Sequence, residues 1–574
     1  MQQVLNVKRK RGIPSFSQLK QLPRFLNSKE RKIGLAALAV ACLSIIILGG
    51  QFLATHIQRV PASGGEYTEG MVGYPHYINP LYSSASEVDA ALARLTFAGL
   101  MRMDPQAGLV PDIAESYSIS QDERSYTFIL RDGVKWHDGE PVTSADVLFT
   151  ITAMQNPDYG SPLASTLAGI SVSTDDPRTV TFVLPEPFAP FLSLMTTGLL
   201  PAHIWENMSP ANAQLTQLNL KPIGNGPYMF DKLVKDSRGT LRSLTFVRNP
   251  NYYQDEPNVT RLTFKFFANS QELVAGLHNH TVEGTAMLTA SDLVSFANDR
   301  ALQISDSASR QFVAAFFNLK TSGVLADVKV RRALALATDR ASLLAALPKH
   351  TGQAIDQPLL AGLPGYDATR SIAMADTAGA MSALDEAGWR VPEGGGVRVK
   401  DGKTLDLNIT VLDLPEFTAV GDKLAEQWKA LGAQVTVTKV GSTAFESSVL
   451  KNRSYDILLA GAQYGVFPDP YPFWHSSQAP HPGLNVSQLI SKGADDAIAT
   501  IRATADVNAR TSAYSSLAAA IEEPVAAVFL YQSTVPLVFP AGLKNASIPL
   551  LSSPADRFSK VNEWYLKTVP ALKK

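Results

Sequence analysis

The chain contains few groupings of residue types that could carry out covalent chemistry. Trp136-His137-Asp138 places a histidine beside a carboxylate, a pairing suited to acid-base catalysis or metal binding. No residue at a suitable spacing completes such a site, so we interpret the block as structural. The pairs His278 with His280 and His475 with His481 do not form the HExxH pattern of zinc hydrolases. The sequence therefore predicts neither a catalytic site nor a bound metal.

Glycine-rich segments and cysteine also argue against a cofactor. Gly394-Gly395-Gly396 and Gly224-Asn225-Gly226 lack the strand-to-helix context and the lysine of a phosphate-binding loop. We interpret Arg131-Asp132-Gly133 and Asn225-Gly226-Pro227 as turns, because glycine adopts backbone angles that other residues avoid. The only cysteine is Cys42, so a disulfide or a cysteine-based metal site is excluded. No cofactor is expected, and any ATP chemistry would belong to a partner subunit.

The charge distribution separates a basic N-terminal segment from an acidic remainder. Residues 1–32 carry nine Lys or Arg residues and Glu30, a net charge of +8. The whole chain has a net charge of -1, which leaves -9 for the residues that follow. An acidic body of ordinary globular composition, with 45% hydrophobic and 18% charged residues, has no electrostatic basis for binding nucleic acid.

An uncharged apolar run at residues 33–54 is long enough to cross a membrane as one helix, which needs about 20 residues. The basic cluster before it predicts a cytoplasmic tail at 1–32 and an external body. A cleaved signal peptide is one alternative. Another is a lipoprotein acylated at Cys42, since Ala39-Val40-Ala41-Cys42 resembles a processing site. We expect a linker at 55–66, where Pro, Ser and Gly discourage regular structure.

The body alternates β-like and helical segments, which is typical of an α/β protein, and its length indicates roughly three or four domain-sized units. Residues 405–412, 417–431 and 433–440 are expected to form a βαβ unit. The other expected elements are strands at 125–130 and 455–460, a helix at 143–154 with a threonine cap, and a continuous helix at 328–347.

Two long motifs carry a resemblance to a known family. They are LVPDIAESYSIS at 109–120 and YTFILRDGVKWHDGEPVTSADVLF at 126–149. With them the chain resembles the family 5 extracellular solute-binding proteins of ABC importers, which include oligopeptide, dipeptide and nickel receptors. Further motifs follow in the order of that family at 222–228, 248–253, 330–334, 338–340, 387–389, 455–456 and 469–470.

The resemblance implies a periplasmic-binding-protein-like fold of type II (cluster C), with two lobes and an extra small domain, preceded here by one transmembrane helix. Lobe I would combine 67–98, 214–310 and 535–574. The extra small domain of lobe I would be 99–213, and lobe II would be 311–534. The ligand would lie between the lobes.

The resemblance also implies a binding site in the loop that follows the strand at 455–460. In peptide receptors of the family an aspartate just before the Asp-Pro pair binds the ligand amine, whereas this chain has Gly465 or Val466 there. Either Asp469 replaces that aspartate or the ligand has no free amine at this place. The family's pocket often carries a tryptophan near Ala462, for which Tyr464 and Phe467 substitute here. The expected ligand-binding residues are Tyr77, Asn79, Gly461, Ala462, Gln463, Tyr464, Gly465, Phe467 and Asp469.

Tyr77 and Asn79 lie in the segment Tyr74 to Leu81, whose aromatic and amide groups could contact an extended ligand or could pack near the hinge. Both interpretations are kept open here.

The function expected from these residues is binding of short peptides by a monomeric body, which delivers them to ABC permease subunits in the membrane. Backbone hydrogen bonds and roomy, wet pockets would tolerate varied side chains. A receptor for a sugar, a metal chelate or a signalling peptide is an alternative within the same class. A secreted hydrolase and a chaperone-like surface protein are alternatives from other classes, although no nucleophile with a base stands out in the sequence.

Overall fold

The computed structural model describes residues 27–104, 107–321 and 323–573. The chain divides into two compact units. One comprises residues 63–566, and the other combines the N-terminal residues as far as Ala62 with the residues from Lys567 onward. We describe each unit by itself.

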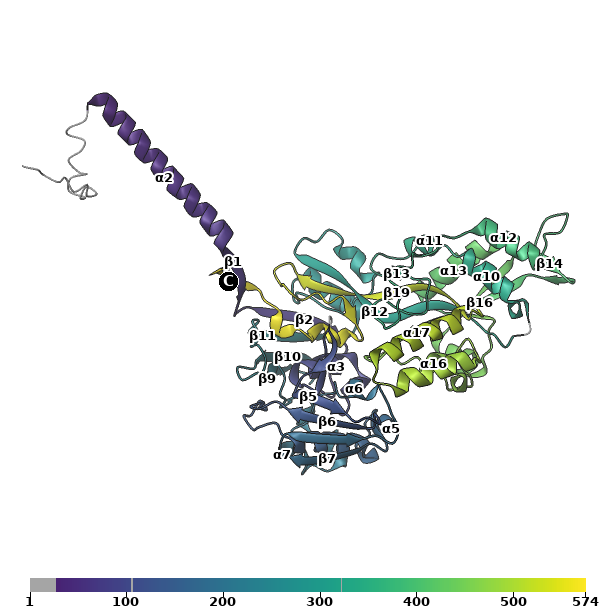
Figure 1. Ribbon diagram of the computed structural model, residues 1–574, viewed down its shortest axis with the longest axis horizontal. Helices are drawn as coiled ribbons and strands as arrows, with labels where there is room; N and C mark the ends of the chain where they lie inside the picture. Colours follow the sequence, from purple (N-terminus) through teal and green to yellow (C-terminus); the bar gives the residue numbers. More distant parts are fainter. Residues whose placement is uncertain (1–26, 105–106, 322, 574) are drawn as a thin grey trace, which may run out of the picture. The chain divides into compact units, whose positions relative to one another are not determined.

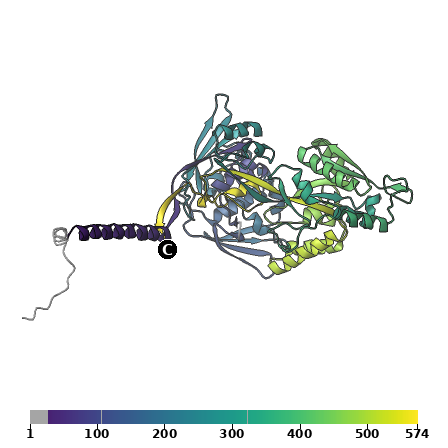
Figure 2. The same ribbon diagram turned by 90° about the horizontal axis from the view of Figure 1, so that it is seen from above.

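The N-terminal unit begins with a single long helix, α2 (Ser28–His56). Its segment Ser28–Gln51 is apolar enough to cross a membrane, with a mean hydropathy of 2.5 and no buried part. Strand β1 (Ile57–Ala62) follows and pairs antiparallel with the C-terminal strand β21 (Lys567–Leu572), coloured yellow in Figures 1 and 2. Most of the basic tail expected at 1–32 lies outside the described residues.

The irregular linker expected at 55–66 is wrong in part, because residues Ile57–Ala62 form the strand β1. Pro61 lies opposite Thr568, and Pro570 lies opposite Arg59. A proline lacks an amide proton, but it is tolerated where its nitrogen faces away from the partner strand. In a two-stranded ribbon both strands are edge strands, so proline does not prevent the pairing.

The described part of the larger unit contains three sheets of four or more strands and two two-stranded sheets, and the first of the larger ones has the strand order β2-β11-β10-β9. Strand β2 runs parallel to β11, whereas the other pairs are antiparallel. In β11 every second side chain is buried, as expected for a sheet with one face on the core. The elements of this region are β2 (Glu66–Val72), α3 (Glu87–Thr96), β9 (Tyr228–Lys235), β10 (Leu241–Arg248), β11 (Arg261–Phe267) and α9 (Ser270–His278).

The second sheet, which we call the small sheet, has the antiparallel strand order β5-β6-β8-β7. Its side chains share one hydrophobic core with the first sheet, since Phe128 and Phe264 belong to the same buried cluster. The elements are β3 (Met101–Asp104), β4 (Gly108–Pro111), β5 (Ala114–Ile119), β6 (Ser125–Leu130), α4 (Ser144–Gln155), α5 (Ala164–Leu167), β7 (Ser171–Asp176), β8 (Thr179–Val183), α6 (Phe191–Leu194), α7 (Ala202–Trp205) and α8 (Pro210–Ala213).

Two local predictions in this region are confirmed. The strand expected at 125–130 is β6. Helix α4 starts after Thr143, whose backbone N–H donates to the Asp146 carboxylate at 2.7 Å in a capping box. Gly133 and Gly139 have φ angles of +76° and +99°, as turns there require.

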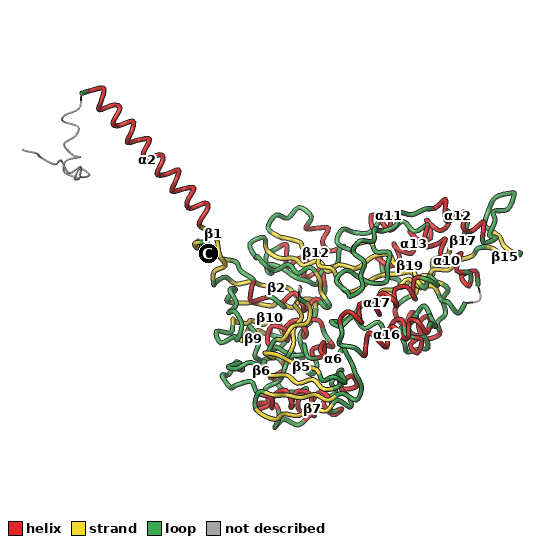
Figure 3. The backbone as a smooth tube through the Cα atoms, viewed as in Figure 1, coloured by secondary structure: helices red, strands yellow, loops and turns green. Residues whose placement is uncertain are grey.

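The third sheet, which we call the large sheet, has the strand order β13-β19-β12-β18-β16-β17, and β20 also pairs with β12. Helices α11 and α13 lie on one side of β19, and α16 and α17 lie on the other (Figure 3). The strands are β12 (Leu302–Phe317), β13 (Gly352–Ala354), β16 (Asp406–Leu412), β17 (Gln434–Val440), β18 (Ile457–Gln463), β19 (Ala527–Pro540) and β20 (Leu550–Leu551). The helices are α10 (Val328–Leu336), α11 (Arg340–Ala345), α12 (Thr377–Glu386), α13 (Pro415–Lys429), α14 (Ser442–Ala444), α15 (Tyr471–Trp474), α16 (Lys492–Ala503) and α17 (Val507–Glu522). A small separate hairpin joins β14 (Val399–Lys400) to β15 (Lys403–Thr404).

The predicted βαβ unit is confirmed, because β16 and β17 are parallel strands joined by α13. The continuous helix predicted at 328–347 is wrong. It is two helices, α10 and α11, separated at Thr338 and Asp339. The Asp339 carboxylate accepts a hydrogen bond from the Ser342 N–H at 2.9 Å, so it caps a new helix.

Strands β12 and β19 are the longest pair and run side by side (Figure 1). The lobe boundaries expected at 310/311 and 534/535 fall inside these continuous strands, and the boundaries themselves stay a prediction. Ala308 pairs with Thr534 and Phe312 pairs with Gln532. Residues 309–311 therefore lie opposite Ser533 alone, which makes a bulge in β12.

Gly226 was expected to adopt backbone angles that other residues avoid, as part of a turn. Neither Gly226 nor the neighbouring Gly224 has a positive φ angle, so this expectation does not explain them. A Cβ atom on Gly224 would overlap the carbonyl oxygen of Thr96, and one on Gly226 would come within 2.6 Å of the Leu95 carbonyl oxygen. These glycines permit close packing of backbone against α3 rather than unusual turn angles.

Candidate functional site

A cavity of ≈ 430 Å³ lies between strands around the small sheet and loops of the large sheet. Its wall on the side of the small sheet is apolar and aromatic, and the opposite wall carries two arginines. The first wall includes Met103, Leu109, Tyr117, Ile119 and Tyr126, and the second includes Arg310, Val466, Phe467, Arg510 and Tyr514.

The predicted site loop begins later than the sequence indicated, because β18 continues to Gln463. Gly461 and Gln463 are exposed, whereas Ala462 is buried in the core. The Gln463 side-chain amide donates to the Ser552 carbonyl at 3.0 Å. Side chains of a strand alternate between its two faces, so only every second residue here faces outward.

Tyr464 is a core residue in this structure. Its side chain is 3% exposed and packs with Phe312 and Phe473 at ring-centroid distances of 6.0 and 5.6 Å. Burial raises the pKa of Tyr464 to about 12. The structure therefore does not support the predicted contact between this side chain and a ligand. Ala462 is also buried in the core, so the structure does not support its predicted contact with a ligand either.

Two of the next three residues of the loop line the cavity. Phe467 and Val466 line it, as expected for the predicted residue Phe467. Gly465 is exposed, and its carbonyl oxygen accepts a hydrogen bond from Arg310 Nη1 at 3.0 Å. The same nitrogen donates to the Val466 carbonyl. Arg310 therefore fixes the backbone of Gly465 and Val466.

Asp469 forms an ion pair with Arg502. Arg502 Nε lies 3.2 Å from Asp469 Oδ2, and the Tyr471 N–H donates to Oδ1 at 3.0 Å. Burial raises the pKa of the Asp469 carboxyl, although these contacts oppose the shift. Asp469 is not among the residues that line the cavity, so it is not placed as a substitute for an amine-binding aspartate.

Two predicted binding residues lie in the segment Tyr74 to Leu81, and in the structure they pack within the fold. Asn79 has no exposed surface, and its amide donates to Asn219 Oδ1 at 3.0 Å. Its own Oδ1 accepts the Leu81 N–H at 2.9 Å. The Tyr77 ring lies 5.2 Å from that of Tyr82. Neither Tyr77 nor Asn79 lines the cavity, so their predicted contact with a ligand is not supported.

Arg310 was missed by the sequence analysis. It lies in the bulge of β12 and is 7% exposed, and burial lowers its pKa. Its Nε is buried without a hydrogen-bond partner among the described residues. The available signal was a lone charge just before the apolar run Phe312 to Phe317.

Hydrogen bonds cross from the small sheet to α16 and α17 at the rim of the cavity. The Glu123 carboxylate accepts the Ala505 N–H at 2.8 Å and the Thr504 hydroxyl at 3.3 Å. The Ala189 N–H donates to the Arg502 carbonyl at 2.7 Å. These three hydrogen bonds, which we call the rim contacts, join two parts of the chain that meet only through the fold.

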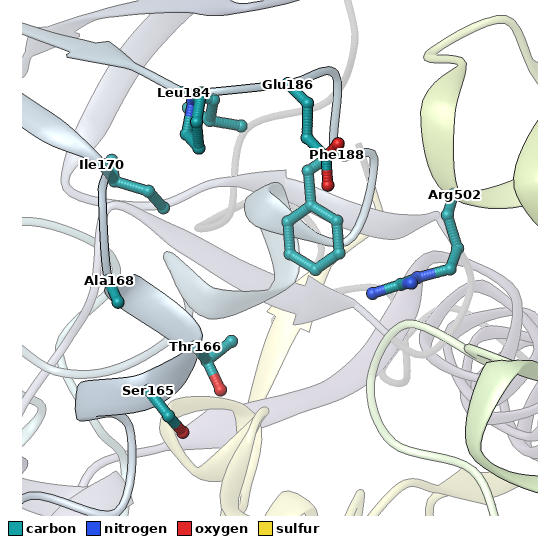
Figure 4. Close-up of a pocket in the computed structure, with 9 residues that line it drawn as sticks. Ser165, Thr166, Ala168, Ile170, Leu184, Glu186, Phe188 and Arg502 are labelled. Carbon is teal, nitrogen blue, oxygen red and sulfur yellow. The ribbon is translucent and has the colours of Figure 1, made fainter. Parts of the chain in front are cut away.

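A second cavity of ≈ 320 Å³ lies beside the rim contacts (Figure 4). Figure 4 shows the Arg502 side chain reaching toward Phe188, and the guanidinium carbon lies 5.2 Å from the centre of that ring. It lies 4.4 Å from the ring of Tyr471. None of the predicted binding residues lines this cavity, so we take the cavity that Phe467 lines as the candidate site.

His137 has a structural role in this fold. The Gly224 N–H donates to His137 Nδ1 at 3.1 Å, which leaves Nε2 protonated to donate to the Gly226 carbonyl at 3.0 Å. Burial lowers the pKa of His137 to about 4. Among the described residues no three His, Cys, Asp or Glu side chains are grouped so that they could hold a metal ion.

Two sheets with a ligand-sized cavity between them are the arrangement of a two-lobed binding protein, and comparison with known proteins identifies the family. Residues 108–483 match the family described as bacterial extracellular solute-binding proteins, family 5 Middle. The chain belongs to this family, so the resemblance drawn from the sequence motifs is confirmed, and so is the two-lobed α/β fold.

Individual relatives cover most of the chain. The oligopeptide-binding protein AppA of Bacillus subtilis is 26% identical, over 94% of this chain and 99% of its own. Its structure in complex with a nonapeptide has a TM-score of 0.63 and 25% identity, covering 88% of this chain and all of that one. NikZ of Campylobacter jejuni, solved with Ni(L-His), has a TM-score of 0.66 and 28% identity, covering 87% of this chain and 99% of that one.

His137 should make stability depend on pH. Its pKa in the folded chain is about 4, below its ordinary value of 6.5, so between these values only the unfolded chain gains the proton. His137 therefore lowers the free energy of unfolding as the pH falls from 6.5 toward 4. We expect His137→Gln to be less stable at pH 7.5, by about 1–3 kcal/mol, because a hydrogen-bonded buried group is disturbed.

That difference should shrink as the pH falls to 4.5, since the variant has no group to protonate there. Urea unfolding at several pH values measures it. The exposed His76→Gln is the matched control. A difference from the unmodified protein that stays constant with pH would show that His137 is not buried in its neutral form.

Proposed function

We propose that this chain is the substrate-binding component of an ABC importer and that it binds short peptides in the cavity between the small and large sheets. The observation that carries the proposal is that cavity, with its aromatic wall and the loop residues Val466 and Phe467 that line it, in a member of this family. A volume of ≈ 430 Å³ lies within the range of about 300–1,000 Å³ typical of small-ligand sites. The relative AppA, described as an oligopeptide-binding protein, supports peptides as the ligand class.

The walls suit a ligand with varied side chains. Tyr117, Ile119 and Phe467 offer apolar surface without a narrow polar pattern that would select one side chain. Backbone groups of the ligand would supply most of the hydrogen bonds, which are the same in every peptide. We therefore propose loose specificity for side chains.

Peptide binding is tested on the full-length protein in detergent, with mixed pools of peptides of two to five residues. We expect retained peptides in mass spectrometry, and a stabilisation of about 2.7 kcal/mol when a retained peptide is present at roughly 100 times its Kd. Phe467→Ala should weaken binding, whereas Phe445→Ala, a half-buried phenylalanine outside the cavity, should not. The proposal fails if no peptide is retained, and retention of Ni(L-His) alone would assign a metal complex instead.

We also propose that the ligand favours a closed arrangement, which then docks on the permease. The parts that would move are joined by β12 and β19, whose bulge interrupts the regular ladder. The rim contacts supply hydrogen bonds between those parts. A ligand shifts such an equilibrium only by its differential affinity for the two arrangements.

Glu123→Ala tests this closing step. The change removes the acceptor for Ala505 and Thr504, so the closed arrangement loses about 1 kcal/mol and ligand affinity should fall roughly fivefold. Calorimetry with a retained peptide measures the effect. Glu115→Ala is the matched control, because Glu115 pairs with Arg178 and makes no rim contact. Equal affinities for the two variants would exclude a role of the rim contacts in closure.

For the N-terminal unit we propose a single uncleaved membrane anchor, with the basic tail in the cytoplasm and the body outside the cell. Helix α2 continues directly into β1, which pairs with the end of the chain. Removal at Cys42 would shorten the apolar helix by half of its length and leave apolar residues at the new terminus. A monomeric body stays a prediction.

The intact mass of the membrane-extracted protein distinguishes the alternatives. We expect the mass of the complete chain, 61.9 kDa, without an added acyl group. Cys42→Ser should remain in the membrane fraction at an unchanged level, because the apolar helix and not the thiol provides the attachment. Loss of Cys42→Ser from membranes, or a shortened acylated species, would establish the lipoprotein.

A further inference from the structure

The charges around the candidate cavity have one sign. Arg310 and Arg510 line it, and the described residues that line it include no Asp or Glu. We infer that the cavity binds a carboxylate group of its ligand through Arg310, with Arg510 as a second cation, so that the preferred ligands are peptides with a free carboxyl group at this end. This inference rests on the proposed function and names the substrate class of the same site.

The fold holds Arg310 in place before any ligand arrives. The bulge at 309–311 turns this residue out of the regular ladder of β12, as bulges redirect side chains. The Arg310 backbone carbonyl accepts the Tyr464 N–H at 2.8 Å. Its Nη1 donates to the carbonyls of Gly465 and Val466. The guanidinium is thus fixed at the loop, and little conformational entropy is lost when an anion binds.

The charge of Arg310 is not neutralised by the chain itself. The Asp556 carboxylate is the acidic group that acts on it most strongly, but Asp556 pairs with Arg94 at 3.2 Å and accepts the Ser552 N–H at 3.0 Å. Asp469 pairs with Arg502. Among the described residues Arg310 forms no ion pair, although it is 7% exposed.

Nη1 donates to two carbonyls and Nε is buried without a partner, so Nη2 is the nitrogen left to donate to a ligand in the cavity. Arginine carries its donors in a planar fork, and a guanidinium donor to a carboxylate makes a charge-assisted hydrogen bond. Because a buried cation without an anionic partner is costly, binding a carboxylate stabilises this site more than binding a neutral group would.

Arg510 adds to the positive charge from α17. Its Nη1 donates to the carbonyls of Thr504 and Ala505 at 3.1 Å each. The nearby acid on that side is Glu123, which is engaged in the rim contacts and does not line the cavity. A ligand amine would therefore meet two cations here and no carboxylate, so this end of the site disfavours it.

The test compares two peptide pools of the same sequences, one with a free C-terminal carboxylate and one with a C-terminal amide. Binding to the full-length protein in detergent is followed by mass spectrometry and then by calorimetry with the best-retained sequence. We expect the acid to bind at least tenfold more tightly than its amide, as a charge-assisted hydrogen bond contributes about 1.5–3 kcal/mol. Arg310→Gln should weaken binding of the acid more than binding of the amide, so that the two affinities come within about twofold of each other.

Arg310→Lys, which keeps the charge but not the fork, should retain part of the preference. Arg242→Gln, an exposed arginine paired with Asp236, is the control and should retain all of it. The inference is overturned if acid and amide bind equally to the unmodified protein. It is also overturned if Arg310→Gln weakens both forms to the same extent, since the residue would then act only on the loop. Binding of neither pool would instead refute the proposed function, and the inference with it.

Discussion

The antiparallel pairing of β12 with β19 is the constraint on which the rest of the larger unit depends. These two strands connect the region built on the first sheet with the region built on the large sheet. The register of their pairing therefore determines which side chains face the cavity. The register changes twice, between Ala308 and Phe312 and again between Val313 and Ala314, and the first change is the larger. At the first change Gln532 Nε2 donates to the Ser309 carbonyl at 2.8 Å, which secures the bulge by a side chain from the opposite strand. A one-residue slip would turn the buried run Phe312 to Phe317 toward the wrong faces of the sheet, and both flanking cores would be lost.

Much of the fold could be predicted from the sequence because its signals are local. The cap at Thr143, the alternation in Ser125–Leu130 and the βαβ pattern around α13 each depend on residues within a few positions of one another. The family itself was recognisable from continuous motifs. The failures have one local and one distant cause. The break between α10 and α11 follows from a single aspartate that caps a new helix, whereas the strand β1 depends on pairing with the far end of the chain.

The candidate site was predicted less well, since a binding surface is made by the alternation of strands and by contacts between distant segments. The loop after residue 460 was treated as one continuous contact surface. The strand in fact continues to Gln463, and Ala462 and Tyr464 face the core while Gly461, Gln463 and Gly465 are exposed. If the alternation of the strand had been continued for four residues beyond Ala460, the buried residues would have been separated from the exposed ones. Arg310 was beyond such reasoning, because its contact with the Gly465 carbonyl joins residues 155 positions apart.

The position of Arg310 also sets the charge that the site presents. A loop whose carbonyl oxygens point toward one place creates negative potential there, and a cation can satisfy it from the chain or from the ligand. Here Arg310 Nη1 donates to the carbonyls of Gly465 and Val466. The loop can then no longer offer those oxygens to a ligand amine. Loss of Arg310 would leave these carbonyls without that donor, and displacement of the loop would leave a buried cation without acceptors, which is costly in a buried site. The arginine and the loop therefore depend on each other, and the charge that a ligand meets follows from both.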